Sequence, residues 1–309
     1  MRAIAIQEYG GPEVLKVRDV EDPVVGPDVV LVKARAAGVN PVDYKMRQGG
    51  LETRYPCHFP LIPGWDVAGV VEEVGPAVTE FRPGDEVVGY VRRDHVQWGT
   101  YAEFVPAPVR TLAPKPGALS WAEAAALPLT ALTAWQVLTR VLDVREGDVV
   151  LVHAAAGGVG SFAVQLAQVL GARVIGTASE GNHDYLRDLG AEPVAYGEGL
   201  IDRIRAVAPD GVTAAVDLIG EEAVDVSLDV LTEGGRLASV LNPARVRKAG
   251  GKYWFVRPDA DDLRKICQLA EQGRVRVHVE RALPLEEAAE AHRVLEGGHM
   301  RGKFALEIS

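Results

Sequence analysis

Cysteine is almost missing from this sequence. The 309 residues include two cysteines, Cys57 and Cys267. Two thiols cannot build the disulfide framework on which small secreted domains depend, so that class is excluded and a reducing compartment is favoured. A chain of this length buries enough apolar surface to fold without such cross-links.

Long hydrophobic runs and an excess of basic residues are missing as well. No stretch of about 18 apolar residues occurs, which is the length that a membrane-spanning helix needs. The 33 lysines and arginines are outnumbered by 43 acidic residues, giving a net charge of −10. Because nonspecific nucleic-acid binding requires a basic face, we expect neither a nucleic acid nor a membrane as a partner. The charged, alternating N-terminus predicts a strand and not a signal peptide, and we expect a cytoplasmic protein.

The remaining composition is that of an ordinary globular protein. Hydrophobic residues make up 48% and charged residues 25%, which excludes wholesale disorder, and the length suggests two domains. About the first 115 residues contain short strand-like runs separated by Gly and Pro turns, which predicts a small β-barrel or sandwich. These strands are expected at residues 2–9, 29–37, 67–74, 86–91 and 101–105.

From residue 120 onward, helices alternate with strands. Ser120 and Glu123 form a capping box before an Ala- and Leu-rich helical stretch, which Pro128 interrupts. Repeated β-α units predict a parallel sheet covered by helices. The expected strands are 148–153, 173–177, 193–196, 214–219 and 236–241. The expected helices are 159–170, 184–189, 200–208, 221–231, 259–272 and 285–295.

The strongest motif is VVLVHAAAGGVG at residues 149–160. A buried strand leads directly into glycines and a helix, where backbone N–H groups and the helix dipole can bind a pyrophosphate. The fingerprint G-x-G-x-x-G is matched in part, with Ala155 in place of its first glycine. The alternative is a purely structural turn, but the strand–turn–helix context favours a dinucleotide cofactor. The expected backbone contacts come from Gly157, Gly158 and Val159.

The end of the next strand indicates which dinucleotide is bound. NAD sites place Asp or Glu there, about 20 residues beyond the fingerprint. Here the strand ends in GTAS at residues 176–179, without a carboxylate. A carboxylate would repel the extra phosphate of NADPH, so its absence favours NADPH. Glu180 lies close by, however, and the nearest cations are His183 and Arg187. We expect NADPH, with the strength of its preference over NADH left open.

Several segments together resemble a known family. AAAGGVGSFAVQLA, LPLTALTAWQVL, AAGVNPVDYKMRQG and FPLIPGWDVAGVVEEVG are similar to the zinc-independent quinone oxidoreductase branch of the medium-chain dehydrogenase/reductase superfamily. The resemblance covers nearly the whole chain. It implies an α/β fold, with a doubly wound Rossmann domain at residues 119–265 and a GroES-like β-barrel catalytic domain at residues 1–118, completed by residues 266–309. It also implies an active site in the cleft between the two domains.

The residues argue against a catalytic metal. Catalytic zinc needs three Cys, His or carboxylate ligands and an open position. Where the zinc-dependent relatives carry Cys and His, this sequence has Asn40 and Trp65, so only Asp66 could ligate. Alcohol oxidation is hard without a Lewis acid. Hydride transfer to a quinone or enone is easier, because hydrogen bonds can stabilise the resulting anion.

Asn40 and Tyr44 are the candidate catalytic residues. Asn40 resembles the family's Asn beside the nicotinamide, and its alternative is a turn residue before Pro41. Tyr44 is the candidate proton donor or oxyanion partner, with aromatic packing as its alternative and Tyr55 as a competitor. Asp43, between them, is interpreted as a solvated charge, as is Lys45.

Two sources supply further candidates for cofactor binding. Ligands bind at the carboxyl ends of strands in such sheets, which points to Ile219, Gly220 and Leu241. The resemblance implies that Thr130 lies near the pyrophosphate and the nicotinamide, although it could instead cap a helix. It also implies that Phe255 covers the nicotinamide, with core packing as the alternative.

The resemblance places the remaining candidates near the phosphates and the chain end. Ser179 and Tyr196 resemble positions that hold the adenosine phosphate, but the Lys expected beside them is missing. Arg301 and Lys303 resemble a C-terminal cation pair that reaches the cofactor, and solvated charges are the alternative.

Taken together, the sequence predicts a metal-free NADPH-dependent reductase of quinones or α,β-unsaturated carbonyls. One alternative is an enoyl-thioester or alkenal double-bond reductase, which would share every motif. Another is a non-catalytic NADPH-binding sensor or structural protein, because cofactor binding does not guarantee turnover. Residues 236–241 and 252–256 resemble the edge strands through which the family dimerises, so a homodimer is expected.

Overall fold

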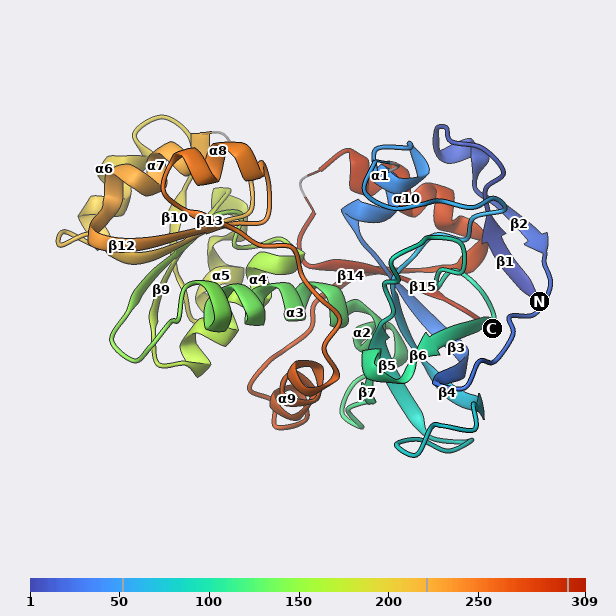
Figure 1. The fold of residues 1–309 in the computed structure, drawn as a ribbon. Coiled ribbons are helices and arrows are strands. Elements are labelled where there is room, and N and C mark those ends of the chain that lie inside the picture. Colours follow the sequence, from blue (N-terminus) through green and yellow to red (C-terminus); the bar gives the residue numbers. More distant parts are fainter. Residues whose placement is uncertain (52, 221, 299) are drawn as a thin grey trace. The chain divides into compact units, whose positions relative to one another are not determined.

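The chain is seen in a computed structural model that describes residues 1–51, 53–220, 222–298 and 300–309. It contains two compact units. Unit 1 comprises Met1–Leu129 and Pro258–Ser309, and unit 2 comprises Thr130–Arg257. Unit 2 is therefore inserted into unit 1 along the chain. Figure 1 labels the elements of both units.

These boundaries differ from the predicted ones at 118/119 and 265/266. Helix α2 (Trp121–Ala126) packs on strands β3 (Val29–Val39) and β4 (Asp66–Val74) of unit 1. Helix α9 (Ala260–Glu271) packs on β7 (Leu112–Pro114). Both helices bury their apolar faces in unit 1, whereas the predicted bounds had grouped α2 and the first half of α9 with the Rossmann domain.

Unit 2 is built on a six-stranded parallel sheet with the order β10-β9-β8-β11-β12-β13. Its strands are β8 (Val149–Val152), β9 (Arg173–Ala178), β10 (Glu192–Ala195), β11 (Val212–Asp217), β12 (Leu231–Ser239) and β13 (Lys252–Tyr253). The chain moves outward from β8 to β10 and then from β11 to β13 on the other side. This is the doubly wound topology, and the predicted Rossmann fold is confirmed.

Helices connect these strands and bury their apolar faces against the sheet. They are α4 (Gly158–Val169), α5 (His183–Asp188), α6 (Leu200–Val207), α7 (Glu222–Val230) and α8 (Pro243–Lys248), with a short η4 (Glu180–Asn182). One buried cluster joins strand residues such as Leu151 and Ile175 to Val224 of α7. Residue 221, where the predicted helix begins, lies outside the described residues. The short helix α8 was not predicted, and β12 starts earlier than the predicted residue 236.

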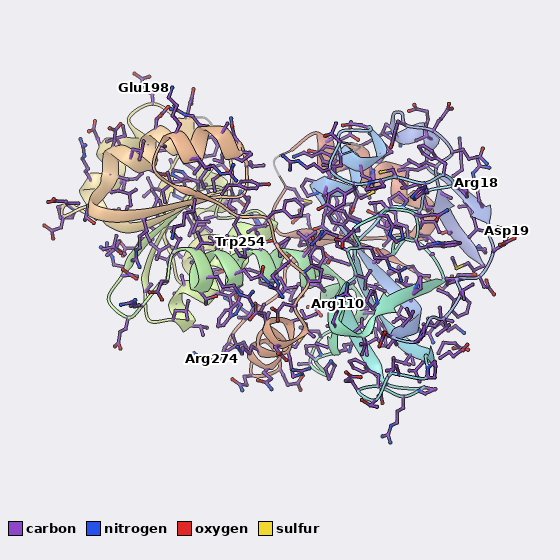
Figure 2. All side chains as sticks on the ribbon, viewed as in Figure 1. Arg18, Asp19, Arg110, Glu198, Trp254 and Arg274 are labelled. Carbon is purple, nitrogen blue, oxygen red and sulfur yellow. The ribbon has the colours of Figure 1, made fainter. Side chains whose placement is uncertain are left out.

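A buried glutamine ties the end of unit 2 to its first helix. α3 (Pro128–Gln136) continues into a π-helical turn, η3 (Val137–Val141). Gln136 Oε1 accepts hydrogen bonds from Trp254 Nε1 at 3.2 Å and from the Arg257 N–H at 3.1 Å. Gln136 Nε2 donates to Arg257 O at 3.0 Å. Figure 2 shows the side chain of Trp254 beside α3.

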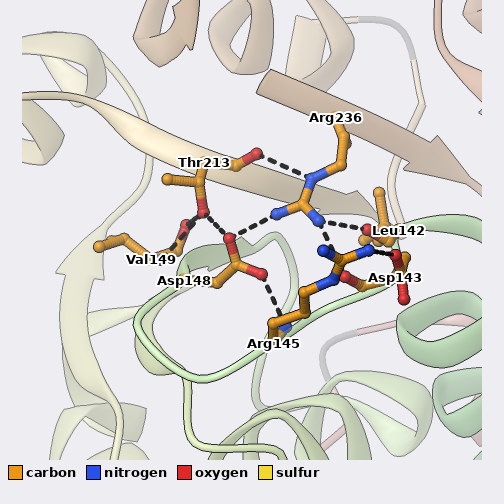
Figure 3. A network of polar contacts seen from close by, with 7 residues as sticks. All are labelled: Leu142, Asp143, Arg145, Asp148, Val149, Thr213 and Arg236. Carbon is orange, nitrogen blue, oxygen red and sulfur yellow. Dashed lines mark hydrogen bonds and ion pairs between the residues drawn. The ribbon is translucent and has the colours of Figure 1, made fainter. Parts of the chain in front are cut away.

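At the amino end of the sheet, polar side chains bind the strands together (Figure 3). Asp148 Oδ1 accepts from Thr213 Oγ1 at 2.6 Å and from Arg236 Nη2 at 2.5 Å. Asp148 Oδ2 accepts from the Arg145 N–H at 2.7 Å. Arg236 Nη1 donates to Leu142 O at 2.6 Å. This network links β11 and β12 to the loop that leads into β8.

Unit 1 contains a sheet with the order β14-β15-β3-β4-β5-β7, in which β6 also pairs with β3, and a two-stranded sheet of β1 and β2. Further strands are β1 (Arg2–Ala5), β2 (Lys16–Asp19), β5 (Glu86–Tyr90), β6 (Phe104–Pro108), β14 (Val279–Pro284) and β15 (Lys303–Glu307). The C-terminal strand β15 pairs antiparallel with β3. Closely packed strands of this kind agree with the predicted GroES-like fold.

The helices of unit 1 bring two corrections. α1 (Pro41–Arg47) occupies a segment in which no helix was predicted, and the predicted helix 285–295 is a short η5 (Leu285–Glu287) followed by α10 (Ala288–Glu296). The strand expected at 101–105 lies at Phe104–Pro108 instead. The other short helices are η1 (Pro12–Val14) and η2 (Val109–Thr111). None of the helices in the described ranges is long and apolar enough to cross a membrane.

Candidate active site

The glycine turn of unit 2 joins β8 to α4. Gly157 is the N-cap of α4, and the helix begins at Gly158. An α-helix leaves the N–H groups of its first turn without partners inside the helix. Here these groups belong to Gly158, Val159 and Gly160, at the positive end of the helix dipole. This arrangement can bind a phosphate or pyrophosphate.

Gly157 and Gly160 are glycines for different reasons. A Cβ on Gly160 would lie 2.3 Å from Ala154 O and 2.7 Å from Ala155 Cα, so the fold itself excludes a side chain there. A Cβ on Gly157 would meet Ala154 O at 3.4 Å, and the backbone φ of −77° suits any residue. The fold thus leaves open space beside Gly157 that a pyrophosphate can approach, and the turn fits the predicted dinucleotide.

Side chains that the sequence analysis did not single out hold this turn in place. Ala154 has a left-handed φ of 50°, which is uncommon for a residue other than glycine. Its N–H donates to Thr177 Oγ1 at 3.2 Å. The neighbouring His153 is buried, with Nε2 3.0 Å from Ser227 Oγ. Burial lowers the pKa of His153 to about 4, against an opposing effect of Asp217, so the imidazole is neutral near pH 7.

The carboxyl ends of β11 and β12 are joined through Asp217 and Ser239. Asp217 Oδ1 accepts from the N–H groups of Ile219 at 2.9 Å and Gly220 at 2.8 Å. Asp217 Oδ2 accepts from Ser239 Oγ at 2.6 Å, and Ser239 Oγ also accepts from the Leu241 N–H at 3.0 Å. The predicted Ile219, Gly220 and Leu241 therefore belong to one hydrogen-bonded pair of loops. The Ile219 side chain is 52% exposed and available to contact a ligand.

The residues predicted to hold the adenosine phosphate follow β9 and β10. Ser179 comes directly after β9, and its Oγ accepts from Asn182 Nδ2 at 3.1 Å. Tyr196 follows β10 and is 53% exposed. Arg187, one of the nearest cations, forms an ion pair with Asp184 at 2.6 Å. Asp184 thus already neutralises part of the charge of Arg187.

Thr130 and Phe255 occupy different settings in unit 2. Thr130 is buried within α3, so it does not cap the start of that helix. Phe255 is half-buried in the segment that Gln136 holds through Trp254 and Arg257. The contacts of Thr130 and Phe255 with a cofactor stay predictions.

In unit 1, Asn40 lies at the end of β3 between two charged side chains. The strand β3 has β4 on one side and β15 on the other, and these strands contribute Asp66 and Lys303. Asn40 Nδ2 donates to Asp66 Oδ2 at 2.9 Å, and Lys303 Nζ donates to Asn40 Oδ1 at 2.5 Å. All three side chains are buried. We call Asn40, Asp66 and Lys303 the amide clamp.

The charges of the clamp have further partners. Lys303 Nζ donates to Val39 O at 2.6 Å, and Asp66 Oδ1 accepts from the Leu129 N–H at 2.9 Å. Burial raises the pKa of Asp66, and Lys303 opposes this rise. Burial lowers the pKa of Lys303, and Asp66 and Asp43 oppose that fall. The predicted contact of Lys303 with a cofactor therefore competes with its bonds to Val39 and Asn40. Arg301, the other predicted cation, is half-buried.

Asp43 is a further buried partner of Asn40, beside the amide clamp. The prediction that it is solvated is wrong, because it is fully buried. It accepts hydrogen bonds from the Asn40 N–H at 2.8 Å and from Tyr101 Oη at 3.0 Å. Tyr101 Oη lies 3.3 Å from His292 Nε2, and His292 Nδ1 lies 3.5 Å from Arg47 Nη1. Burial raises the pKa of Asp43 to about 7, so this carboxyl exchanges a proton near neutral pH.

The two tyrosines considered as proton donors differ in their surroundings. Tyr44 lies on α1, and burial together with the charge of Glu296 raises its pKa. Tyr55 is buried, packs edge-on against Trp65 with ring centroids 5.8 Å apart, and accepts from Arg92 Nη1 at 3.2 Å. Tyr55 thus has a packing role, which leaves Tyr44 as the candidate donor.

Comparison with known proteins identifies the family. A family described as "Alcohol dehydrogenase GroES-like domain" matches residues 26–117, and one described as "Zinc-binding dehydrogenase" matches residues 189–306. A mouse "Quinone oxidoreductase" is 35% identical over 328 residues, covering 99% of this chain and 97% of the relative. The chain belongs to the zinc-independent quinone oxidoreductase branch of the medium-chain dehydrogenase/reductase superfamily.

Two further relatives of this branch extend the comparison. An Arabidopsis thaliana "NADPH-dependent alkenal/one oxidoreductase, chloroplastic" is 36% identical over 316 residues, covering 99% of this chain and 79% of the relative. The solved structure of the quinone oxidoreductase from Coxiella burnetii has a TM-score of 0.88 and 34% identity, and the match covers 100% of this chain and 99% of that one. The relatives thus share both units with this chain.

Trp65 and Asn40, which the sequence analysis compared with zinc-ligand positions, both have partners within unit 1. Trp65 is buried in an aromatic cluster with Tyr55 and Tyr90, the latter at a centroid distance of 6.1 Å. Asn40 is held by the amide clamp. Within the described ranges, no group of three His, Cys, Asp or Glu side chains is placed to hold a metal ion.

The buried partners of Asn40 are the main features that the sequence analysis missed. One signal for Asp43 was present. Asn40, Pro41 and Asp43 have the spacing of a helix start, with a capping residue, proline in the first turn and an acid three residues on. The roles of Tyr101 and His292 carry no local signal, because these residues come from distant parts of the chain.

Proposed function

We propose that this protein is a metal-free NADPH-dependent oxidoreductase that reduces quinones or α,β-unsaturated carbonyls. The observation that carries the proposal is the turn at Gly157, where the fold leaves space for a Cβ and presents the N–H groups of α4. The names of the mouse and Arabidopsis relatives support the substrate classes. When bound, NADPH supplies the hydride.

The chain's own residues would bind the cofactor and manage a proton. Gly157, Gly158 and Val159 would hold the pyrophosphate, and Ile219 would offer an apolar contact at the sheet edge. The second Nδ2 hydrogen of Asn40 would donate to the nicotinamide side or to the substrate carbonyl. Hydride addition to an enone or quinone leaves an anion, which takes up one proton from Tyr44 Oη or from water. Tyr44 is protonated at neutral pH, as an acid must be, although its raised pKa makes it a weaker acid.

NADPH is proposed over NADH on two grounds. No carboxylate stands at the tip of β9, and the Arabidopsis relative is named as NADPH-dependent. Ser179 and the exposed Tyr196 would face the extra phosphate. Quenching of tryptophan fluorescence gives the dissociation constants of NADPH and of NADH, which lacks the extra phosphate. Comparing the two constants tests this preference directly. Equal affinities would contradict it.

We also propose a homodimer in the cytoplasm. One part of the sequence prediction needs correction: β12 pairs with both β11 and β13, so it lies inside the sheet. β13 is one of the two edge strands of that sheet, and an edge presents backbone groups to which a second copy can add. Light scattering of the purified protein tests the dimer.

The experiment for the main proposal measures NADPH binding and NADPH consumption with quinones, enones and enoyl thioesters, before and after exhaustive chelation. Gly157→Asp places a carboxylate at the turn and should weaken NADPH binding roughly 100-fold or more, while Gly157→Ala tests whether bulk alone matters. Unchanged affinity in Gly157→Asp refutes the cofactor site. Loss of activity on chelation refutes the metal-free mechanism.

The same assay separates the alternatives. Consumption with enoyl thioesters but not with quinones or enones supports the double-bond reductase that shares these motifs. Binding without consumption of NADPH for any acceptor supports a sensor or structural protein. Tyr44→Phe should lower kcat for enones while leaving NADPH affinity unchanged, if Tyr44 supplies the proton.

A further inference from the structure

The environment of Asn40 is more specific than a helix cap requires. An N-cap asparagine ordinarily turns its side chain toward the N–H groups of its own helix. Asn40 is the N-cap of α1 and has the capping-box arrangement with Asp43, and its amide also reaches Asp66 and Lys303. The backbone half of the cap is kept, because Asp43 accepts from the Asn40 N–H. Beyond the cap, the side chain is therefore held by residues from two other strands.

The two partners of the amide are opposite in hydrogen-bonding character. A lysine ammonium only donates, and an ionised carboxylate only accepts. The amide can meet both only with Oδ1 toward Lys303 and Nδ2 toward Asp66. Rotating it by half a turn would set Oδ1 against the Asp66 carboxylate and Nδ2 against the ammonium, and buried groups left unsatisfied in this way are costly.

We propose that Lys303 and Asp66 are positioning residues, which fix the orientation of the Asn40 amide and aim its second Nδ2 hydrogen at a ligand. The sheet makes this possible, because β3 lies between β4 and β15 and so receives the acid from one neighbour and the lysine from the other. Asp66 is also fixed by the Leu129 N–H, and Lys303 by Val39 O. The inference rests on the proposed function for Asn40, and it extends that function to Lys303 and Asp66.

The test needs a variant that removes one buried positive charge and one buried negative charge together. Lys303→Met alone leaves two carboxylates near an empty position and could fail to fold. The double variant Lys303→Met/Asp66→Asn removes one charge of each sign and so keeps the net charge, and it removes the preference for one amide orientation. Lys33→Met is the matched control, because Lys33 lies on β3 and is exposed.

One readout does not depend on turnover. The side-chain amide signal of Asn40 in 15N-labelled protein is assigned by its loss in Asn40→Ala. In the double variant we expect its hydrogen exchange to accelerate roughly tenfold or more, with no change in Lys33→Met. An unchanged exchange rate in a folded double variant would overturn the inference. This readout decides the matter even if no acceptor is reduced and the proposed function fails.

The second readout uses activity. The double variant should lower kcat roughly 10- to 100-fold, while the KM for the acceptor and the NADPH affinity stay within about twofold. In an Asn40→Ala background the same two substitutions should have no further effect on kcat. An equal loss of kcat in both backgrounds would show that Lys303 and Asp66 act independently of Asn40, and would overturn the proposal.

Discussion

The two ends of the unit 2 sheet each carry an aspartate held by a hydroxyl group from a neighbouring strand, yet the aspartates do different things. At the amino end, Asp148 accepts from Thr213 and pairs with Arg236 (Figure 3). At the carboxyl end, Asp217 accepts from Ser239 and from the backbone N–H groups of a loop. The first aspartate joins strands through a cation. The second uses neutral donors to shape a loop whose Ile219 side chain is left exposed.

This difference teaches how one sheet separates stability from ligand binding. At the amino end, the charged side chains pair with one another, so the polar groups there already have partners. At the carboxyl end, backbone N–H groups donate to the aspartate. The N–H groups in the first turn of α4 stay available to another partner. We therefore expect substitutions at the amino end to change stability alone, and those at the carboxyl end to change stability and NADPH affinity together.

The largest effect is expected for Gly160→Ala. The new Cβ would lie 2.3 Å from Ala154 O, and backbone atoms on a strained turn cannot move away cheaply. We expect the free energy of unfolding to fall by about 3 kcal/mol or more, measured by urea unfolding. The control Gly157→Ala should cost about 1 kcal/mol or less, because its Cβ has room. Equal losses in the two variants would contradict the distinction drawn between these glycines.

His153, at the carboxyl end, is expected to make the free energy of unfolding depend on pH by about 2 kcal/mol. Its pKa is lowered to about 4 in the folded protein from an ordinary 6.5, so the unfolded chain binds a proton that the folded one does not. The stability it contributes is complete above pH 6.5 and is lost as the pH falls toward 4. In His153→Gln the pH dependence between 6.5 and 5 should flatten by about 1.4 kcal/mol per pH unit.

Asp217→Ala should lower the free energy of unfolding by about 2 kcal/mol, because it leaves a buried N–H group, a partly buried N–H group and a hydroxyl without their acceptor. It should also weaken NADPH binding roughly tenfold, since the loop with Ile219 and Gly220 loses its support. Asp217→Asn, which keeps one carbonyl oxygen, should fall between this variant and the wild type. Affinity that is unchanged in Asp217→Ala would remove the carboxyl-end loop from the binding site.

The smallest effect is expected at the amino end. Arg236→Met breaks a partly exposed ion pair and the bond to Leu142 O, and it should cost about 1 kcal/mol. NADPH affinity, measured by fluorescence titration, should stay as in the wild type. If Arg236→Met weakened NADPH binding as much as Asp217→Ala, the two ends of the sheet would not be separate in function.

The sequence predicted the parts of this protein that depend on local patterns. The β-α alternation predicted the parallel sheet of unit 2, and the run around Gly157 predicted the turn before α4. The domain boundaries fell elsewhere, because α2 and α9 are decided by what they pack against and not by their own periodicity. The short helix α1 was missed although its cap was readable.

The amide clamp marks the limit of such predictions. Asn40 was singled out by its resemblance to a family position, but Asp66 and Lys303 are separated from it by 26 and 263 residues along the chain. Lys303 was interpreted as a cation that reaches the cofactor, and its bond to Asn40 follows only from the pairing of β15 with β3. Contacts made by register between distant strands leave no periodic trace in a sequence.

The origin of β15 has a consequence for how the protein is made. A chain synthesised from its amino end presents Asp43 and Asp66 long before the lysine that offsets their charge. Unit 2 is one uninterrupted stretch and can fold on the ribosome before β14 and β15 of unit 1 are made. Unit 2, with its glycine turn, would then be finished first, and the Asn40 half would be completed only when translation reaches β15.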